Sequence, residues 1–235
     1  MYVKSRKSRL EDNALPEISL HTALKEWYAE PNDRFEVPLC NYVIDIVRGD
    51  LLVEIQTRNF TAIKHKLNKL VPHHSVRLVY PIAQEKWIVK LSGDRGDLVS
   101  RRKSPRRGTV EDVFNELVSF PELLLNHNFS IEVLLIKEEE YRRYDNTRGW
   151  RKKGWTTYKR RLLEVVEKKL FRVPSDMDSL LPSSLIESFT TYDLAISITK
   201  SRQLAQRMLY CLRLMGCVKP IGKRGNAILY SRIDT

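Results

Sequence analysis

The sequence contains no apolar run as long as the roughly 18 residues that a membrane-spanning helix requires. Its first segment, residues 1–17, is basic and lacks the apolar stretch of a secretory signal. There are only three cysteines, Cys40, Cys211 and Cys217, and no CxxC pair, which excludes a disulfide framework and a cysteine-based zinc site. The absence of a phosphate-binding glycine loop excludes the usual nucleotide hydrolases. We therefore expect a cytoplasmic protein with reduced cysteines in its core and no membrane partner.

What the sequence has is positive charge. The 235 residues carry a net charge of +12, and 42% of them are hydrophobic, which is enough for a buried core. The basic residues gather in three tracts, over residues 95–107, 141–172 and 200–224, and the last tract contains no acidic residue. Binding a polyanion releases its condensed counterions, so such tracts favour double-stranded DNA as the partner and a nucleoid-associated protein. The alternative is that the tracts are merely solvated surfaces.

Apolar periodicity organises the first part of the chain. It predicts a helix over residues 16–30 and a second helix over 59–71. β-branched runs predict strands between and after them, over residues 35–39, 41–47, 51–57, 75–82 and 86–91. The turn sequence Arg48-Gly49-Asp50 joins two of these strands into a hairpin. This order predicts an α/β (α+β) core with a mixed sheet and helices on both faces.

The middle of the chain combines basic loops with further elements. We expect loops over residues 92–108 and 144–155, a helix over 110–120 and a strand over 129–136, whereas residues 158–170 fit a helix or a strand equally well. Pro174 and Ser175 mark a boundary, so the first domain is predicted to span residues 1–173. The loop residues expected to contact DNA are Arg101, Arg102, Lys103, Arg151, Lys152 and Lys153.

Residues 174–235 are predicted to form a second domain. Thr190 and Asp193 form a capping box before a short helix, and either Thr199 or Ser201 caps a longer helix that ends at Gly216. Two strands joined by residues 223–225 follow. Helix, turn, helix and basic hairpin resemble a winged helix-turn-helix domain.

That resemblance implies that the second helix enters the major groove and that the hairpin contacts the DNA backbone or the minor groove. The alternative is a winged helix that binds another protein. The residues expected to contact DNA are Arg202, Gln203, Gln206 and Arg207 on the helix and Lys223, Arg224 and Asn226 on the hairpin.

Acidic residues gather in the first hairpin. Glu54 and Gln56 are two residues apart on one strand, so their side chains share a face of the sheet, and Asp45 on the partner strand lies beside them. Glu26 on the preceding helix approaches from the side. Two or three carboxylates with open positions for water and phosphate suit Mg²⁺ or Mn²⁺.

Residues 16–91 resemble the PD-(D/E)XK, or restriction-endonuclease-like, nuclease superfamily. The match lies in the order helix, three strands, helix, strand and in the residues Glu26, Ile44-Asp45 and Glu54-Ile55-Gln56. The resemblance implies that Asp45 and Glu54 bind the metal, that Glu26 is an accessory ligand and that Gln56 orients the nucleophile. Gln56 stands where the family usually has lysine, and Lys64 or Lys66 on the following helix is the candidate to supply that positive charge.

These features predict a metal-dependent DNA endonuclease, acting as a homodimer because one metal site cuts only one strand. The alternative is a non-catalytic DNA-binding protein that keeps a degenerate nuclease fold. The geometry of the acids separates the two. Convergence of Asp45, Glu54 and Glu26 favours catalysis, whereas burial of Glu54 in an ion pair favours the alternative.

Overall fold

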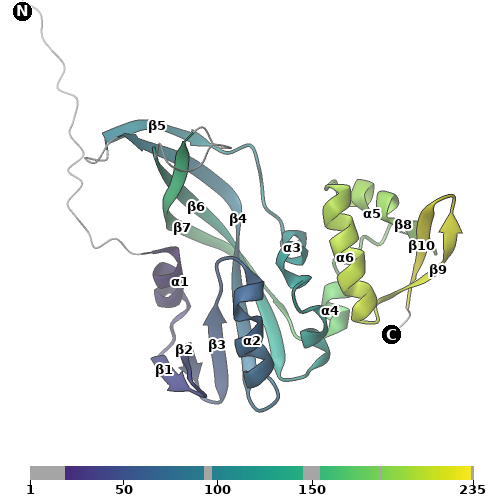
Figure 1. The fold of residues 1–235 in the computed structure, drawn as a ribbon, viewed down its shortest axis with the longest axis horizontal. Coiled ribbons are helices and arrows are strands. Elements are labelled where there is room, and N and C mark those ends of the chain that lie inside the picture. Colours follow the sequence, from purple (N-terminus) through teal and green to yellow (C-terminus); the bar gives the residue numbers. More distant parts are fainter. Residues whose placement is uncertain (1–18, 93–96, 145–153, 186, 234–235) are drawn as a thin grey trace, which may run out of the picture.

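The protein is a mixed α/β structure with a large sheet and a smaller one (Figure 1). The structure is a computed structural model that describes residues 19–92, 97–144, 154–185 and 187–233. Within these ranges no helix is both long and apolar enough to cross a membrane.

The order of elements predicted for the first part of the chain is confirmed. The elements are α1 (Leu20–Tyr28), β1 (Arg34–Leu39), β2 (Tyr42–Arg48), β3 (Leu51–Ile55), α2 (Phe60–Leu70) and β4 (Ser75–Ser92). The prediction of two separate strands over residues 75–82 and 86–91 is wrong, because both lie in β4, a single strand of 18 residues. The polar residues Gln84 and Glu85 interrupt the apolar pattern, but a bulge between Ala83 and Glu85 lets the strand continue beside its partner.

The predicted loop over residues 92–108 is wrong for its central part. The elements that follow β4 are β5 (Asp97–Lys103), the 3-10 helix η1 (Val110–Val113), α3 (Phe114–Leu117), the 3-10 helix η2 (Pro121–Leu125), β6 (Phe129–Tyr144) and β7 (Trp155–Phe171). All seven side chains of β5 are exposed, so the sequence has no alternation of apolar and polar residues there that would predict a strand. Residues 158–170 lie in β7 and form a strand. Three predicted DNA contacts, Arg151, Lys152 and Lys153, lie outside the described residues.

The large sheet has the strand order β1-β2-β3-β4-β6-β7, with β5 also on β4. β4 is parallel to β3 and to β6, and the other pairs are antiparallel. Helices cover both faces, as predicted. α1 packs with Ile46 and Val53 on one face, and α2 packs with Ile44 and Leu52 on the other.

The sheet extends beyond α1 and α2 in a strand arm (Figure 1). We define the strand arm as β5 together with residues 83–92 of β4, 136–144 of β6 and 155–165 of β7. Its charged side chains line a cleft described below.

The C-terminal module (residues 174–233) contains the two predicted helices and the hairpin. Its elements are α4 (Pro174–Asp178), β8 (Phe189–Thr190), α5 (Thr191–Ser197), α6 (Arg202–Leu214), β9 (Val218–Arg224) and β10 (Ala227–Arg232). The capping box of Thr190 and Asp193 is confirmed, and the Ser201 side chain caps α6 by accepting the Leu204 N–H at 3.2 Å. Gly216 follows α6 with φ +77°, a left-handed conformation that favours glycine. The hairpin turn lies one residue later than predicted, because Arg224 still pairs with Ala227.

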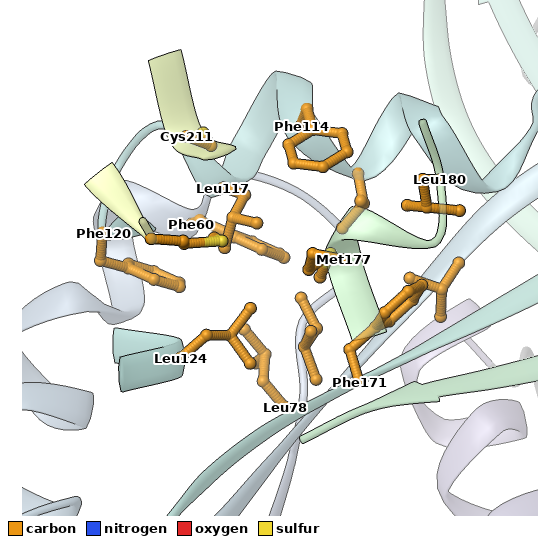
Figure 2. Packing of buried hydrophobic residues seen from close by; sticks show 14 of the residues in the cluster. Phe60, Leu78, Phe114, Leu117, Phe120, Leu124, Phe171, Met177, Leu180 and Cys211 are labelled. Carbon is orange, nitrogen blue, oxygen red and sulfur yellow. The ribbon is translucent and has the colours of Figure 1, made fainter. Parts of the chain in front are cut away.

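The C-terminal module shares a hydrophobic core with the large sheet. Cys211 of α6 packs with Leu117 of α3 and Phe120, next to Met177 of α4 (Figure 2). Cys211 and Cys217 are buried as predicted, whereas Cys40 is exposed, which corrects its assignment to the core. Because α6 is anchored on α3, its orientation relative to the sheet is fixed by packing.

Candidate active site and nucleic-acid interface

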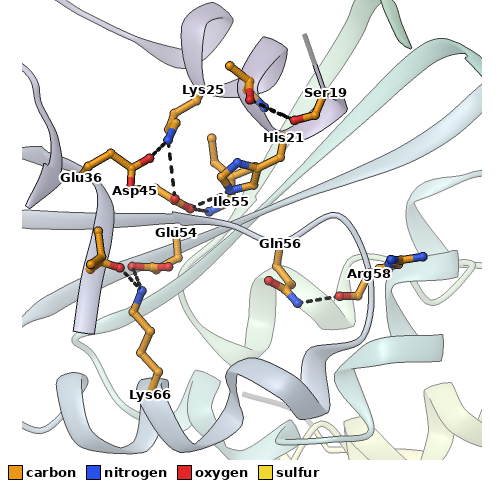
Figure 3. A network of polar contacts seen from close by, with 12 residues as sticks. Ser19, His21, Lys25, Glu36, Asp45, Glu54, Ile55, Gln56, Arg58 and Lys66 are labelled. Atoms are coloured by element: carbon orange, nitrogen blue, oxygen red, sulfur yellow. Dashed lines mark hydrogen bonds and ion pairs between the residues drawn. The ribbon is translucent and has the colours of Figure 1, made fainter. Parts of the chain in front are cut away.

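The Asp45 carboxylate lies where β2 and β3 separate. The pairing of these strands runs from Arg48 and Leu51 to Ile46 and Val53. Beyond that point, Oδ2 of Asp45 accepts the backbone N–H of Ile55 at 2.8 Å in place of a ladder bond (Figure 3). The carboxylate is therefore fixed between the two strands.

Helix α1 supplies basic groups to Asp45. His21 Nε2 lies 3.1 Å from Oδ2, and Lys25 Nζ lies 4.0 Å from Oδ1. Burial by itself would raise the pKa of Asp45, but the hydrogen bonds from His21 and from the Ile55 N–H outweigh it and hold the pKa below its ordinary value. Asp45 is thus an ionised carboxylate with neighbouring positive charge.

Glu54 is the buried member of the acid pair. Its side chain comes from the strand beside Asp45 and points toward α2, where Lys66 Nζ lies 2.5 Å from its Oε1 (Figure 3). Burial raises the pKa of Glu54 to about 7, the ion pair with Lys66 opposes that rise, and the charge of Asp45 adds to it. Lys66 Nζ also donates to the carbonyl oxygen of Val43 at 2.6 Å. Lys66 Nζ is thus shared between the Glu54 carboxylate and the Val43 carbonyl oxygen.

The other two predicted residues lie apart from the acid pair. The Gln56 amide turns toward the start of α2 and donates to the carbonyl oxygens of Arg58 and Asn59 at 2.6 and 3.1 Å (Figure 3). Glu26 is exposed on α1. In the part of the chain that the structure describes, no three His, Cys, Asp or Glu side chains are placed to hold one metal ion. The Asp45 and Glu54 carboxylates therefore lie near enough for the charge of Asp45 to raise the pKa of Glu54, whereas Glu26 does not join them.

Sequence reasoning missed His21 and Lys25. The buried residues of α1 are Leu20, Leu24 and Tyr28. The helix therefore places the side chains of positions 21 and 25 within reach of Asp45 and position 26 toward solvent. The spacing of the apolar residues along α1 could have identified positions 21 and 25 as the ones that turn toward Asp45.

A basic cleft of about 610 Å³ lies between the strand arm and the C-terminal module. Lys86, Arg142 and Arg160 line it from the strand arm, and Gln203 and Arg207 line it from α6. Thr57, which follows Gln56 at the end of β3, also lines it.

Buried glutamates hold the basic side chains of the strand arm. Glu138 of β6 is 0% exposed and lies 2.9 Å from Lys86 Nζ and 2.6 Å from Arg160 Nη2. Glu140 lies 3.0 Å from Lys86 Nζ and 2.7 Å from Arg142 Nη2. Burial alone would raise the pKa of Glu140, but Lys86 and Arg142 lower it to about 2. Sequence reasoning missed this network, because its partners come from strands far apart in the chain.

Of the four residues of α6 that were predicted to contact DNA, two line the cleft and two lie outside it. Arg207 is half-buried and its Nη1 donates to Asn115 Oδ1 of α3 at 2.6 Å, and Gln203 lines the same cleft. Arg202 and Gln206 are exposed.

The predicted contacts on β5 lie on the strand arm. Arg101 and Lys103 are stacked near the Trp87 ring, and Arg101 Nε donates to Glu139 at 2.8 Å. Arg102 is exposed. These residues are therefore placed on a strand rather than on the predicted loop.

The predicted contacts on the C-terminal hairpin are accessible. Lys223, Arg224 and Asn226 are exposed around its turn. Arg224 Nη1 lies 3.2 Å from Asp193 Oδ2, a contact that ties the hairpin to the start of α5.

Comparison with known proteins adds relatives without a stated activity. Residues 18–172 match the family described as "Domain of unknown function (DUF8091)". An "Uncharacterized protein" of Treponema pallidum (strain Nichols) is 33% identical over 221 residues, which is 94% of this chain and 87% of that protein. With 94% of the chain covered, that match includes most of the C-terminal module as well as the large sheet. No solved structure matches the chain significantly.

Proposed function

The chain belongs to the DUF8091 family, and we propose that it binds double-stranded DNA and hydrolyses phosphodiester bonds at Asp45 and Glu54 with Mg²⁺ or Mn²⁺. The observation that carries this proposal is the acid pair itself. Asp45 is held where β2 and β3 separate, its charge acts on the neighbouring Glu54, and Lys66 of α2 reaches Glu54. These are the two metal ligands that the resemblance to PD-(D/E)XK nucleases implies, with Lys66 as the candidate for the lysine that position 56 lacks, whereas Glu26 and Gln56 lie apart from them.

The donor set suits a divalent cation held by two protein carboxylates. Mg²⁺ usually keeps several waters and takes only one or two carboxylates together with substrate phosphates. Asp45 and Glu54 would hold it, and the fit is supported by the buried negative charge of Asp45 beside Glu54, which a cation between them would offset. Such a cation, when bound, supplies charge that polarises the phosphodiester and favours a nucleophilic hydroxide.

The chain's own residues prepare this pair. The Ile55 N–H and His21 fix the Asp45 carboxylate in its ionised form. Glu54 must lose its proton before it can bind a cation, and a pKa of about 7 places that loss near neutral pH. Lys66 keeps a positive charge beside Glu54, which favours the ionised form. Cleavage should therefore rise with pH through about 7.

A second candidate is a DNA-binding protein without hydrolysis. The observation that favours it is the buried ion pair of Glu54 with Lys66, together with the position of Glu26 on the exposed side of α1. If this second function is correct, Lys66 and His21 balance the charges of Glu54 and Asp45, and the protein binds DNA without cleaving it.

We propose further that the C-terminal module is a winged-helix domain and that residues 18–172 have a restriction-endonuclease-like core. The first is supported by two capped helices followed by a hairpin, with β8 as a third strand on β10. The second is supported by the order α1-β1-β2-β3-α2-β4 and the parallel pairing of β3 with β4.

Incubation with supercoiled plasmid distinguishes the two candidates. The purified protein should nick or linearise the plasmid with Mg²⁺ or Mn²⁺ and stop when the ion is chelated. Glu54→Ala and Asp45→Ala should abolish cleavage while a gel shift still reports DNA binding. Asp50→Asn, an exposed acid at the other end of the same hairpin, is the matched control and should cleave normally. Binding without cleavage in the wild-type protein would establish the second candidate, and cleavage by Glu54→Ala would reveal another site.

A further inference from the structure

We infer that the DNA backbone lies in the basic cleft between the strand arm and α6, so that α6 is one wall of a shared site rather than a free recognition helix. This inference rests on the proposed DNA binding and specifies its surface. The cleft joins the two parts of the molecule that share a hydrophobic core.

The strand-arm wall of the cleft presents cations in fixed positions. Lys86, Arg142 and Arg160 are each held by a buried glutamate, so little side-chain freedom remains to be lost when a phosphate binds. Their glutamates lie behind them at 0% and 7% exposure. The wall therefore presents preorganised donors to a ligand in the cleft, and its one lining acid, Glu140, is already paired with Lys86 and Arg142.

Two further cations on the cleft have no acid of their own. Arg207 bonds the neutral Asn115 side chain, and Arg106 is exposed beside Ser104. Neither takes part in an ion pair within the described residues. Five basic residues line the cleft against three acidic ones, of which Glu116 is already engaged by the Phe60 N–H at 3.0 Å. The excess charge and the two unpaired guanidinium groups fit a chain of phosphates.

The cleft also leads to the acid pair. Thr57 lines it, three residues after Glu54, and Arg160 Nη1 donates to the Thr57 carbonyl oxygen at 3.3 Å. A strand lying in the cleft would thus pass the carboxyl end of β3. This placement links the surface that binds phosphate to the carboxylates proposed to act on it.

The experiment is a salt titration of binding to a short fluorescent duplex with the divalent ions chelated, so that cleavage does not enter. Arg207→Gln removes a charge and keeps a donor for Asn115, and Arg106→Ala removes the other unpaired charge. Together they should weaken binding at least about fivefold and reduce the slope of log K against log salt by about 1 for each phosphate that the variant no longer binds. Arg213→Gln, at an exposed position in the last turn of the same helix, is the matched control and should bind within about twofold of the wild-type protein.

Asn115→Ala separates charge from packing, because it breaks the hydrogen bond to Arg207 and leaves the charge in place. It should keep the wild-type salt slope. A loss of affinity in Arg202→Gln with none in the Arg207 and Arg106 variants would place DNA on the outer side of α6 and overturn the inference. Equal affinity in all variants would also overturn it. A wild-type protein that does not bind the duplex at all would instead refute the proposed function.

Discussion

Replacing Glu54 with glutamine should change how the stability of the protein depends on pH. Glu54 is 4% exposed, and burial raises its pKa from 4.5 to about 7. A raised pKa means that the folded protein holds this proton more tightly than the unfolded chain does. The stability that Glu54 contributes is therefore complete below pH 4.5 and is lost as pH rises through about 7.

The size of the effect follows from the difference between the two pKa values. A shift from 4.5 to about 7, at about 1.4 kcal/mol per unit, corresponds to about 3 kcal/mol in the free energy of unfolding. Glutamine has the same shape and does not titrate. Lys66 loses its charged partner in the variant, so the effect is read from the change in the free energy of unfolding between the two pH limits and not from its absolute value. Between these pH limits the variant should gain about 3 kcal/mol relative to the wild-type protein.

Urea denaturation at a series of pH values measures this difference directly. Asp50→Asn, which changes an exposed acid, should follow the wild-type profile. Saturating Mg²⁺ should reduce the wild-type loss at high pH, because a bound cation favours the ionised carboxylate. Parallel profiles for the wild-type protein and Glu54→Gln would refute the reasoning, since they would mean that Lys66 fully compensates the burial of Glu54.

Four shorter predictions follow from other features. Lys66→Met should raise the pKa of Glu54 further and move the rise of cleavage to higher pH, whereas an unmoved profile would exclude Lys66 from the site. Gly108→Ala should destabilise the fold by about 1–3 kcal/mol in a denaturant titration, because the new Cβ would lie 2.6 Å from the Ala83 carbonyl oxygen. DNA affinity should fall steeply with salt, by about 0.9 in log K against log salt for each phosphate contact; a flat plot would mean that the basic residues bind no phosphates. Light scattering should report a dimer, and a mass near 27.6 kDa with and without duplex would favour nicking or binding alone.

The first part of the fold was predictable because its signals are local. Apolar alternation marks β2 and β3, and Gly49 with φ +55° provides the turn that joins them. Asp45 and Glu54 each lie one position beyond the last pair of that hairpin, Ile46 and Val53, which is why the sequence alone could place both acids at the same end of these strands. The predicted approach of Glu26 to these acids is wrong. Position 26 lies on the exposed side of α1, away from the buried residues Leu20, Leu24 and Tyr28.

The strand arm was not predictable in this way, because distant partners stabilise it. Glu138 is charged and yet fully buried, and its compensation comes from Lys86 on β4 and Arg160 on β7. A charged residue in a single sequence indicates solvent exposure unless its partners are known. β5 gives even less signal, since all of its side chains are exposed and only pairing with β4 makes it a strand.

The shared core makes the C-terminal module a structural part of the first domain. Phe114 and Leu117 of α3 are 0% exposed, and they are buried in the same cluster as Met208 and Leu212 of α6. A chain ending at residue 172 would expose these faces to water, at about 25 cal/mol per Å² of apolar surface. We therefore expect that fragment to unfold or aggregate where the whole chain stays folded, as followed by circular dichroism and light scattering. A fragment that stays monomeric with an unchanged midpoint would show that the large sheet folds alone and that the cleft forms between independent bodies.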